Sequence, residues 1–235
     1  MTDSRGGSSP APTALPPGLA ERLLANAAPL HAKAGRTLFS QGESSTTAYI
    51  VREGFMQVML FSIDGREIIL RNIAEGELFG EIAAIDRQPR SATIVALSDC
   101  VLAGIAANAF CAAIEESPGA SMWLARRLAG QVRDLTSRLL ERTALKVRSR
   151  LHCELLRRCR EVSADEDVVT LERSPTHAEL AARIGTHREA VTREMRCLVE
   201  LGIVSQQRRC IVVNDIRALA RLVQEVLGDS PDADA

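Results

Sequence analysis

The segment GEIAAIDRQPRSA, residues 80–92, brings an acidic and a basic side chain close together beside a glycine and a proline. Glu81 and Arg90 are its two chemically active residues, since a carboxylate accepts hydrogen bonds and a guanidinium donates two parallel ones to an anion. Two interpretations are open. The pair either faces one ligand that carries a hydrogen-bond donor and a negative charge, or consists of two solvated charges near a turn.

A second stretch, THAELAARIGTHREAVTREMRCL, has the pattern of two helices joined by a glycine. Thr176 followed by Glu179 is a capping-box pattern, and Gly185 suits the left-handed residue that ends a helix. Thr186 and Glu189 repeat the capping pattern, so we expect the second helix to be capped by Thr186. The following IVSQQRRCIVV predicts two strands with a turn, and the whole is typical of a winged helix-turn-helix.

The N-terminal end of this second helix presents polar side chains that suit DNA bases. Arg188, Glu189 and Arg193 fall within an arc of about 140°. Arginine bonds a guanine edge with two hydrogen bonds, and glutamate accepts one from a cytosine amino group. The alternative is a solvated helix face with an i,i+4 ion pair between Glu189 and Arg193. His187 and Thr192 lie at the same end of the helix.

The elements that must position these residues differ between the two halves of the chain. From residue 31 to residue 105, glycines alternate with short apolar runs such as AYIVR, FMQVMLF and ATIVAL, which predicts a β sandwich or barrel. SIDGRE carries the Asp-Gly hairpin signal between two of these runs. Helices are expected at residues 19–27, 107–116, 120–143 and 145–160.

The helix expected at residues 120–143 has a narrow apolar seam at steps of three and four residues. It either packs on its own domain or pairs with its twin in a dimer, and the charged opposite face favours pairing. The seam consists of Ala125, Leu128, Val132, Leu135 and Leu139.

Composition narrows the class of protein. A chain of 235 residues suggests two domains. The net charge of −1 gives no overall positive charge that would attract nucleic acid, although residues 146–221 carry more Lys and Arg than Asp and Glu. No apolar run approaches the ~20 residues of a membrane span, and the N-terminus lacks the apolar core of a signal peptide, so we expect a cytoplasmic protein. The six cysteines and four histidines lack metal-ligand spacing, so no metal is expected.

GTHREAVTREMRCLVELGIV, followed by RRCIVVND, resembles the winged helix-turn-helix of the cyclic-AMP receptor protein (CRP/FNR) family. QGE at 41–43, AYIVREG at 48–54 and FGEIAAIDRQPRSAT at 79–93 resemble that family's cyclic-nucleotide-binding β-roll. The resemblance covers about residues 19–221 and implies an α+β fold. Its expected parts are a flexible leader (1–17), a β-roll domain (18–117), a dimerisation helix (118–144), a winged helix-turn-helix domain (145–224) and a flexible tail (225–235).

The resemblance implies a role for each part of the opening segment. Glu81 would accept a hydrogen bond from a ribose 2′-hydroxyl, Arg90 would pair with the cyclic phosphate, and Ser91 would add a donor. Gly80 would let the backbone approach the ligand, and a short helix after it would point free N–H groups at the anion. The implied ligand-binding set is Gly80, Glu81, Ile82, Ala83, Arg90, Ser91, Ala92, Leu70, Arg71, Thr136 and Ser137.

The resemblance places the purine against the long helix, at Leu135 and Thr136 or, one residue on, at Thr136 and Ser137. Arg71 stands where better-known members carry a small polar residue. It would either favour a purine carbonyl, as in guanine, or reach solvent. Cyclic AMP is therefore the expected allosteric effector, with cyclic GMP as the competitor and no metal cofactor.

For DNA, Arg188, Glu189 and Arg193 match the family's base-contacting positions in type and spacing. This implies a TGTGA-like half-site, repeated as a palindrome and bound by a homodimer with half-site centres about one helical turn apart. Candidate phosphate contacts are Thr186, Arg208 and Arg209. RNA polymerase is a further expected partner of such a bacterial transcription regulator.

Two other classes of function fit the sequence less well. A redox or gas sensor with the same DNA-binding domain would need a cysteine cluster or a haem ligand, and neither pattern is present. An enzyme, or the regulatory subunit of one, would need a phosphate-binding loop, metal ligands or a catalytic triad, and none of these can be seen. We therefore expect no catalytic activity.

Overall fold

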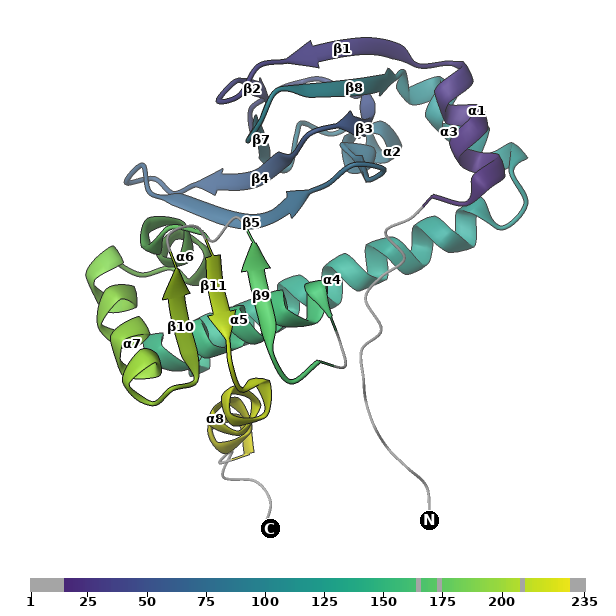
Figure 1. Ribbon diagram of the computed structural model, residues 1–235. Helices are drawn as coiled ribbons and strands as arrows, with labels where there is room; N and C mark the ends of the chain where they lie inside the picture. The colour runs from purple at the N-terminus through teal and green to yellow at the C-terminus, as the bar shows by residue number, and fades with distance from the viewer. Residues whose placement is uncertain (1–14, 164–165, 173–174, 208–209, 229–235) are drawn as a thin grey trace, which may run out of the picture. The chain divides into compact units, whose positions relative to one another are not determined.

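The structure, a computed structural model, describes residues 15–163, 166–172, 175–207 and 210–228 (Figure 1). The chain divides into two compact units, Met1–Thr136 and Ser137–Ala235, and the boundary falls inside the long helix α4 (Ala120–Ala144). Each unit has a hydrophobic core of its own.

The first unit contains two four-stranded antiparallel sheets, as the glycine-punctuated sequence predicts. Their strand orders are β1-β8-β3-β6 and β2-β7-β4-β5. The strands are β1 (Ala28–Ala32), β2 (Thr37–Phe39), β3 (Ala48–Glu53), β4 (Met56–Phe61), β5 (Glu67–Ile73), β6 (Leu78–Phe79), β7 (Thr93–Ala96) and β8 (Cys100–Ile105).

Both sheets contribute side chains to one core, since alternate residues of a strand point to the same face. Phe39 and Met56 come from one sheet and Val51 and Leu102 from the other, and all four are buried. The predicted Asp-Gly hairpin joins β4 to β5, where Gly65 has a φ of +76°. The β-roll is therefore held by packing between its sheets and by short turns.

Helices cover one end of the roll. Helix α1 (Pro17–Ala25) contacts α3 (Ala107–Glu116), and both pack on strand residues of the first sheet (Figure 1). Helix α1 begins two residues earlier than expected because Pro17 at its first position already has the φ that a helix needs. The short helix α2 (Glu81–Asp86) lies between β6 and β7.

Helix α4 buries side chains only over its first two turns, at Ala120, Trp123, Leu124 and Arg127. Beyond them the apolar seam is exposed: Val132, Leu135 and Leu139 are 62%, 48% and 63% exposed. The interpretation of the seam as packing within the chain is therefore wrong for these three residues.

The second unit packs four helices against a three-stranded sheet of order β10-β11-β9. Its buried core includes Leu155, Leu180, Val191 and Met195. Strand β9 was not predicted, because four residues in a polar stretch pair with a strand about forty residues later. The elements are α5 (Val147–Val162), β9 (Val169–Glu172), α6 (His177–Ile184), α7 (Arg188–Glu200), β10 (Val204–Gln207), β11 (Cys210–Val213) and α8 (Ile216–Gly228).

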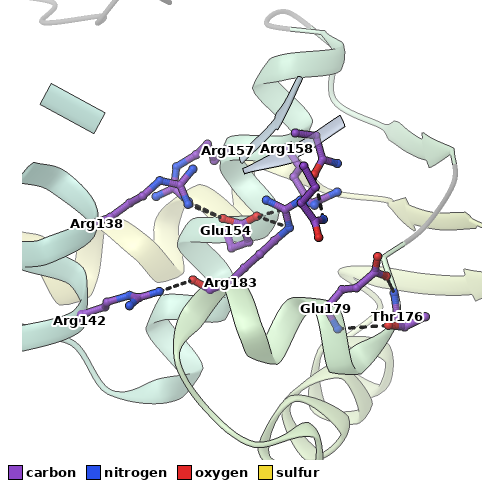
Figure 2. Close-up of polar contacts among 10 residues, drawn as sticks. Arg138, Arg142, Glu154, Arg157, Arg158, Thr176, Glu179 and Arg183 are labelled. Atoms are coloured by element: carbon purple, nitrogen blue, oxygen red, sulfur yellow. Dashed lines mark hydrogen bonds and ion pairs between the residues drawn. The ribbon is translucent and has the colours of Figure 1, made fainter. Parts of the chain in front are cut away.

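Helix α6 is capped as predicted. The backbone N–H of Glu179 donates to Thr176 Oγ1 over 3.1 Å, and the Thr176 N–H donates to Glu179 Oε2 over 2.6 Å (Figure 2). Gly185 ends the helix with a φ of +66°. The expected cap of α7 at Thr186 is wrong: His187 is its N-cap. The Thr186 N–H donates to the carbonyl of Ala181 in the preceding helix.

Replacing the cap residue of α6 should destabilise the second unit. We expect Thr176→Ala to lower its free energy of unfolding by about 1 kcal/mol, because the Glu179 N–H loses its acceptor. Thr176→Ser keeps the hydroxyl and serves as the control. Urea unfolding followed by circular dichroism measures both, and an unchanged midpoint for Thr176→Ala would show that the cap contributes nothing.

Candidate functional site

The first unit contains a cavity of about 90 Å³ between α2, the second sheet and α4. Its polar lining comes from Arg71, Gly80, Glu81, Arg90 and Gln131, and Ser91 and Ala92 lie beside them. Its other lining residues are Phe39, Val58, Phe79, Ile82, Ala83 and Ile94. The cavity thus offers one carboxylate, two guanidiniums and an amide within an otherwise apolar wall.

Arg90 is only 3% exposed and is fixed by neutral oxygens. Its Nε donates to Ser45 Oγ over 2.8 Å, Nη1 to the Gly80 carbonyl over 3.1 Å, and Nη2 to the Thr47 carbonyl over 2.7 Å. The guanidinium also lies over the Phe39 ring, 3.9 Å from its centroid. These contacts fix both the position and the plane of the charged group.

The charge of Arg90 has no carboxylate within ion-pair distance among the residues that the structure describes. Burial lowers the pKa of Arg90, because the charged form loses water. A guanidinium has five N–H groups, and the three hydrogen bonds above leave two for another acceptor. Arg90 lines the cavity, and two N–H groups of one guanidinium are able to bond a pair of anionic oxygens.

Gly80 allows Arg90 to come this close. It has a φ of +75°, and a Cβ there would lie 2.9 Å from Arg90 Nη1 and 3.1 Å from the Thr47 carbonyl oxygen. Any other residue would clash with the guanidinium or with the backbone of Thr47, besides adopting a disfavoured conformation. The glycine of the opening segment is therefore required by the position of Arg90.

Glu81, also 3% exposed, is bound by two residues of α4. Gln131 Nε2 donates to Glu81 Oε1 over 2.9 Å, and Arg127 Nε lies 3.7 Å from the same oxygen. Arg127 donates in addition to the Leu78 carbonyl over 2.6 Å, and burial lowers its pKa. The carboxylate of Glu81 is thereby tied to the long helix.

The residues expected around the ligand fall into two groups. Eight of them line the cavity: Arg71, Gly80, Glu81, Ile82, Ala83, Arg90, Ser91 and Ala92. Leu70, Thr136 and Ser137 are not part of the lining in the described part of the chain. Thr136 instead donates its hydroxyl to the Val132 carbonyl, one turn back along its own helix.

Gln131 was missed by sequence reasoning. It lies on α4 about one turn before Thr136 and is the residue of that helix that lines the cavity. The sequence signal available was its polar side chain next to Gly130, within a helix whose neighbouring positions are apolar or charged.

Arg71 forms an ion pair with a neighbouring carboxylate, and its expected contact with a purine stays a prediction. Its Nη1 forms an ion pair with Glu77 over 2.7 Å and donates to the Asn72 carbonyl over 3.3 Å. The side chain is 30% exposed and still lines the cavity. Glu77 was not anticipated because it lies in the turn between β5 and β6, six residues further on.

The second unit exposes the polar face of α7. Arg188, Glu189 and Arg193 are exposed, as is His187, while Val191 and Met195 face the core. Thr192 is half-buried, and its hydroxyl donates to the Arg188 carbonyl. Arg208 and Arg209, expected to contact phosphates, lie outside the described residues.

His177 links α6 to both α7 and the wing. Its Nδ1 lies 2.8 Å from Thr192 Oγ1, and its Nε2 lies 3.1 Å from Gln206 Nε2 on β10. Burial, and then the nearby charge of Arg188, lower the pKa of His177. The neutral imidazole is therefore the form that fits between the three elements.

Two findings concern the metal-ligating side chains and the buried cysteines in the described part of the chain. No group of three or more His, Cys, Asp or Glu side chains gathers there. Burial raises the pKa of Cys153 and of Cys159 to about 11, which disfavours the reactive thiolate. Among the same residues, no helix is long and apolar enough to cross a membrane.

Two family models match the chain. Residues 29–117 match the cyclic nucleotide-binding domain, and residues 149–222 match the Crp-like helix-turn-helix domain. The first range contains all the cavity residues except Gln131, and the second contains the exposed face of α7.

Curated relatives cover most of the chain. It is 31% identical over 170 residues to the cyclic AMP receptor protein of Thermus thermophilus, covering 72% of this chain and 76% of that relative. It is 29% identical over 182 residues to the cAMP-activated global transcriptional regulator CRP of Pasteurella multocida, covering 77% and 87%. A solved CooA mutant from Carboxydothermus hydrogenoformans shares the fold, with a TM-score of 0.75 at 18% identity over 85% of this chain and 89% of that one.

The lowered pKa of His177 predicts a pH dependence for the second unit. The contribution of His177 to the stability of the fold is complete above its pKa in the unfolded chain, about 6.5. That contribution is lost as the pH falls through the lower pKa of His177 in the folded protein. We expect His177→Gln to reduce the loss of stability between about pH 6.5 and pH 5, measured by urea unfolding.

His187→Gln, an exposed histidine of the same unit, is the matched control and should leave that pH dependence unchanged. If His177→Gln has the same pH dependence as the wild type, the imidazole does not favour its neutral form in the fold.

Proposed function

The chain belongs to the CRP/FNR family of transcription regulators, and we propose that it binds a palindromic DNA site as a homodimer under the control of a cyclic nucleotide. It has the two domains that this activity requires, one for a cyclic nucleotide and one for DNA. As a binder of genomic DNA it would act in the cytoplasm, with RNA polymerase as its downstream partner.

The buried guanidinium of Arg90 is the observation that carries the nucleotide assignment. A positive charge with only neutral oxygens around it is costly in a protein interior. A singly charged cyclic phosphate supplies the missing charge and accepts the two N–H groups that Arg90 leaves over. Ser91, next in sequence and part of the same wall, would add a hydroxyl or backbone donor.

Glu81 would accept the ribose 2′-hydroxyl. Its Oε1 already accepts from Gln131, so the sugar either uses the second carboxylate oxygen or displaces the amide. The cavity of about 90 Å³ is smaller than the roughly 300–1,000 Å³ of ordinary ligand pockets. Side chains have to move to admit a nucleotide, and Gln131, which bonds to Glu81 from α4, is the one we expect to move.

Cyclic AMP is the nucleotide we favour. Two relatives are named for it, and Arg71 is engaged with Glu77, so contacting a guanine carbonyl would require that ion pair to break. Gln131 carries a donor and an acceptor and is our candidate for the base contact within one chain. Thr136 and Ser137 remain candidates for a contact from the partner's copy of the helix.

For DNA, we propose that Arg188, Glu189 and Arg193 contact the bases of a TGTGA-like half-site. The seam at Val132, Leu135 and Leu139, exposed in one chain, would pair two copies and present two such helices. Nucleotide binding to α4 through Glu81 and Gln131 would change that pairing. By linkage, DNA must then raise the affinity for the nucleotide by the same factor.

The phosphate assignment predicts the effect of Arg90→Gln on cyclic AMP binding. Losing two charge-assisted hydrogen bonds, each worth about 1.5–3 kcal/mol, should weaken binding by about 100-fold or more. Isothermal titration calorimetry of the full chain measures this, and titration with cyclic GMP in parallel compares the purines.

Arg87→Gln is the matched control, because Arg87 is exposed and its guanidinium donates to Asn108 outside the cavity. Arg90→Lys keeps the charge but loses the planar fork, and should bind with intermediate affinity. Equal affinities for wild type, Arg90→Lys and Arg90→Gln would refute the phosphate assignment.

The DNA assignment predicts that Arg188→Gln costs about 1–3 kcal/mol on the specific site and relaxes selection of one base pair. Fluorescence anisotropy measures binding to a TGTGA palindrome and to a scrambled duplex, each with and without cyclic AMP. The comparison of duplexes reports the base contacts, and the comparison with and without cyclic AMP reports control by the nucleotide. Arg221→Gln, an exposed arginine on α8, is the control. Identical affinity with and without the nucleotide would contradict control by the ligand while leaving the DNA contact intact.

A further inference from the structure

The second unit contains a cluster of arginines around the buried Glu154 on α5. Glu154 is 2% exposed and accepts from Arg157 over 2.6 Å and from Arg158 over 3.1 Å (Figure 2). Arg138 and Arg183 lie within 3.6 and 3.8 Å of the same carboxylate. Burial opposes the charge of Glu154, but the arginines outweigh it and lower its pKa.

A cavity of about 10 Å³ beside Glu154 has more positive than negative groups in its wall. Five arginines line it: Arg138, Arg142, Arg150, Arg157 and Arg183. The acidic groups of the lining are Glu141 and Glu154, and Arg157 bonds to both. Positive charge therefore exceeds negative charge in a small, partly enclosed space.

Arg150 and Arg142 carry the unbalanced charge. The Arg150 side chain has no hydrogen bond or ion pair to any residue that the structure describes, and its Nε is closed off from solvent without an acceptor. Arg142 donates to the carbonyl of Arg183 over 3.1 Å, and the charges of Arg150 and Arg138 add to burial in lowering the pKa of Arg142. A buried N–H without a partner costs about 1–3 kcal/mol, so an acceptor is expected in the cavity.

We propose that this cavity binds one small inorganic anion of the size of chloride, with Arg142 and Arg150 as its principal partners. A cavity of this volume holds about one water molecule, and a monatomic anion is of similar size. A tetrahedral oxyanion such as phosphate needs more room than the cavity provides. The excess of guanidinium groups favours an anion over a neutral water at this position.

The site would stabilise the turn of the helix-turn-helix. A Cβ built on Gly185 would lie 3.7 Å from Arg142 Cζ and 3.8 Å from Arg150 Nη1, so both arginines pack against the residue that joins α6 to α7. An anion between them would bind the C-terminal part of α4, the start of α5 and the end of α6 together. This role is independent of the nucleotide and of the DNA sequence.

Hydrogen exchange measured by mass spectrometry on the full chain tests the proposal at constant ionic strength, with sodium chloride replacing sodium gluconate. The chain's one tryptophan and one tyrosine, Trp123 and Tyr49, lie in the first unit, so fluorescence would not report on the second. Peptides from α5 and α6 should exchange about tenfold more slowly when chloride is about ten times its Kd. Peptides from the β-roll should be unaffected.

Arg150→Gln should reduce the chloride effect to less than twofold. Arg148→Gln, an exposed arginine two residues earlier on α5, should keep it in full. A bromide-soaked crystal should show an anomalous peak between Arg142 and Arg150.

Three results would overturn the proposal. They are equal exchange in chloride and gluconate, a chloride effect that persists in Arg150→Gln, and protection by phosphate at concentrations where chloride gives none. If Arg150→Gln does not fold, the wild-type exchange data and the bromide peak still decide the matter.

Discussion

The buried charge of Arg90 is the constraint on which the ligand-binding half of the molecule depends. Its three hydrogen bonds reach Ser45, Thr47 and Gly80, so segments separated by about forty residues have to meet at one guanidinium. A Cβ at position 80 would lie 2.9 Å from Arg90 Nη1, so any other residue there would displace the guanidinium. The β-roll supplies neutral oxygens and the Phe39 ring, and leaves the charge itself uncompensated. In the proposed function, a cyclic phosphate would offset the cost of burying that charge.

Helix α4 is the second element that the proposed mechanism requires. Over its first turns it packs on the β-roll and, through Arg127 and Gln131, bonds to Glu81. Beyond them, its apolar seam is left uncovered in the single chain. The same helix thus contacts the carboxylate expected to bind the sugar and carries the surface expected to bind a second copy. In the proposed mechanism, a change at Glu81 would reach the pairing surface along this one helix.

The two units handle buried arginines in different ways. Arg90 is surrounded by neutral oxygens, whereas the arginines of the second unit converge on Glu154 and exceed the carboxylates near them. A buried carboxylate with several arginines is stabilised only if each guanidinium also finds acceptors, because desolvation otherwise exceeds the Coulomb gain. Arg142 finds one in the end of α6, while Arg150 finds none in the described chain. In both proposals, an anion would bind where guanidinium groups outnumber the carboxylates that line the cavity.

Local patterns in the sequence determined much of this protein. Capping residues specified α6, Gly185 specified its end, and Asp64-Gly65 specified a hairpin. The spacing within residues 80–92 predicted that Glu81 and Arg90 share one cavity. Each of these signals acts over a few neighbouring residues. Partners distant in the chain were decided by the tertiary structure. Gln131, and not Thr136, lines the cavity, and Glu77 pairs with Arg71. Strand β9 pairs with β11, and several arginines gather around Glu154. The N-cap of α7 is His187 and not Thr186, whose backbone N–H donates to the Ala181 carbonyl at the end of α6. Side-chain type and spacing indicate what a residue is able to bind. Which partner the residue contacts depends on how the helices and sheets pack.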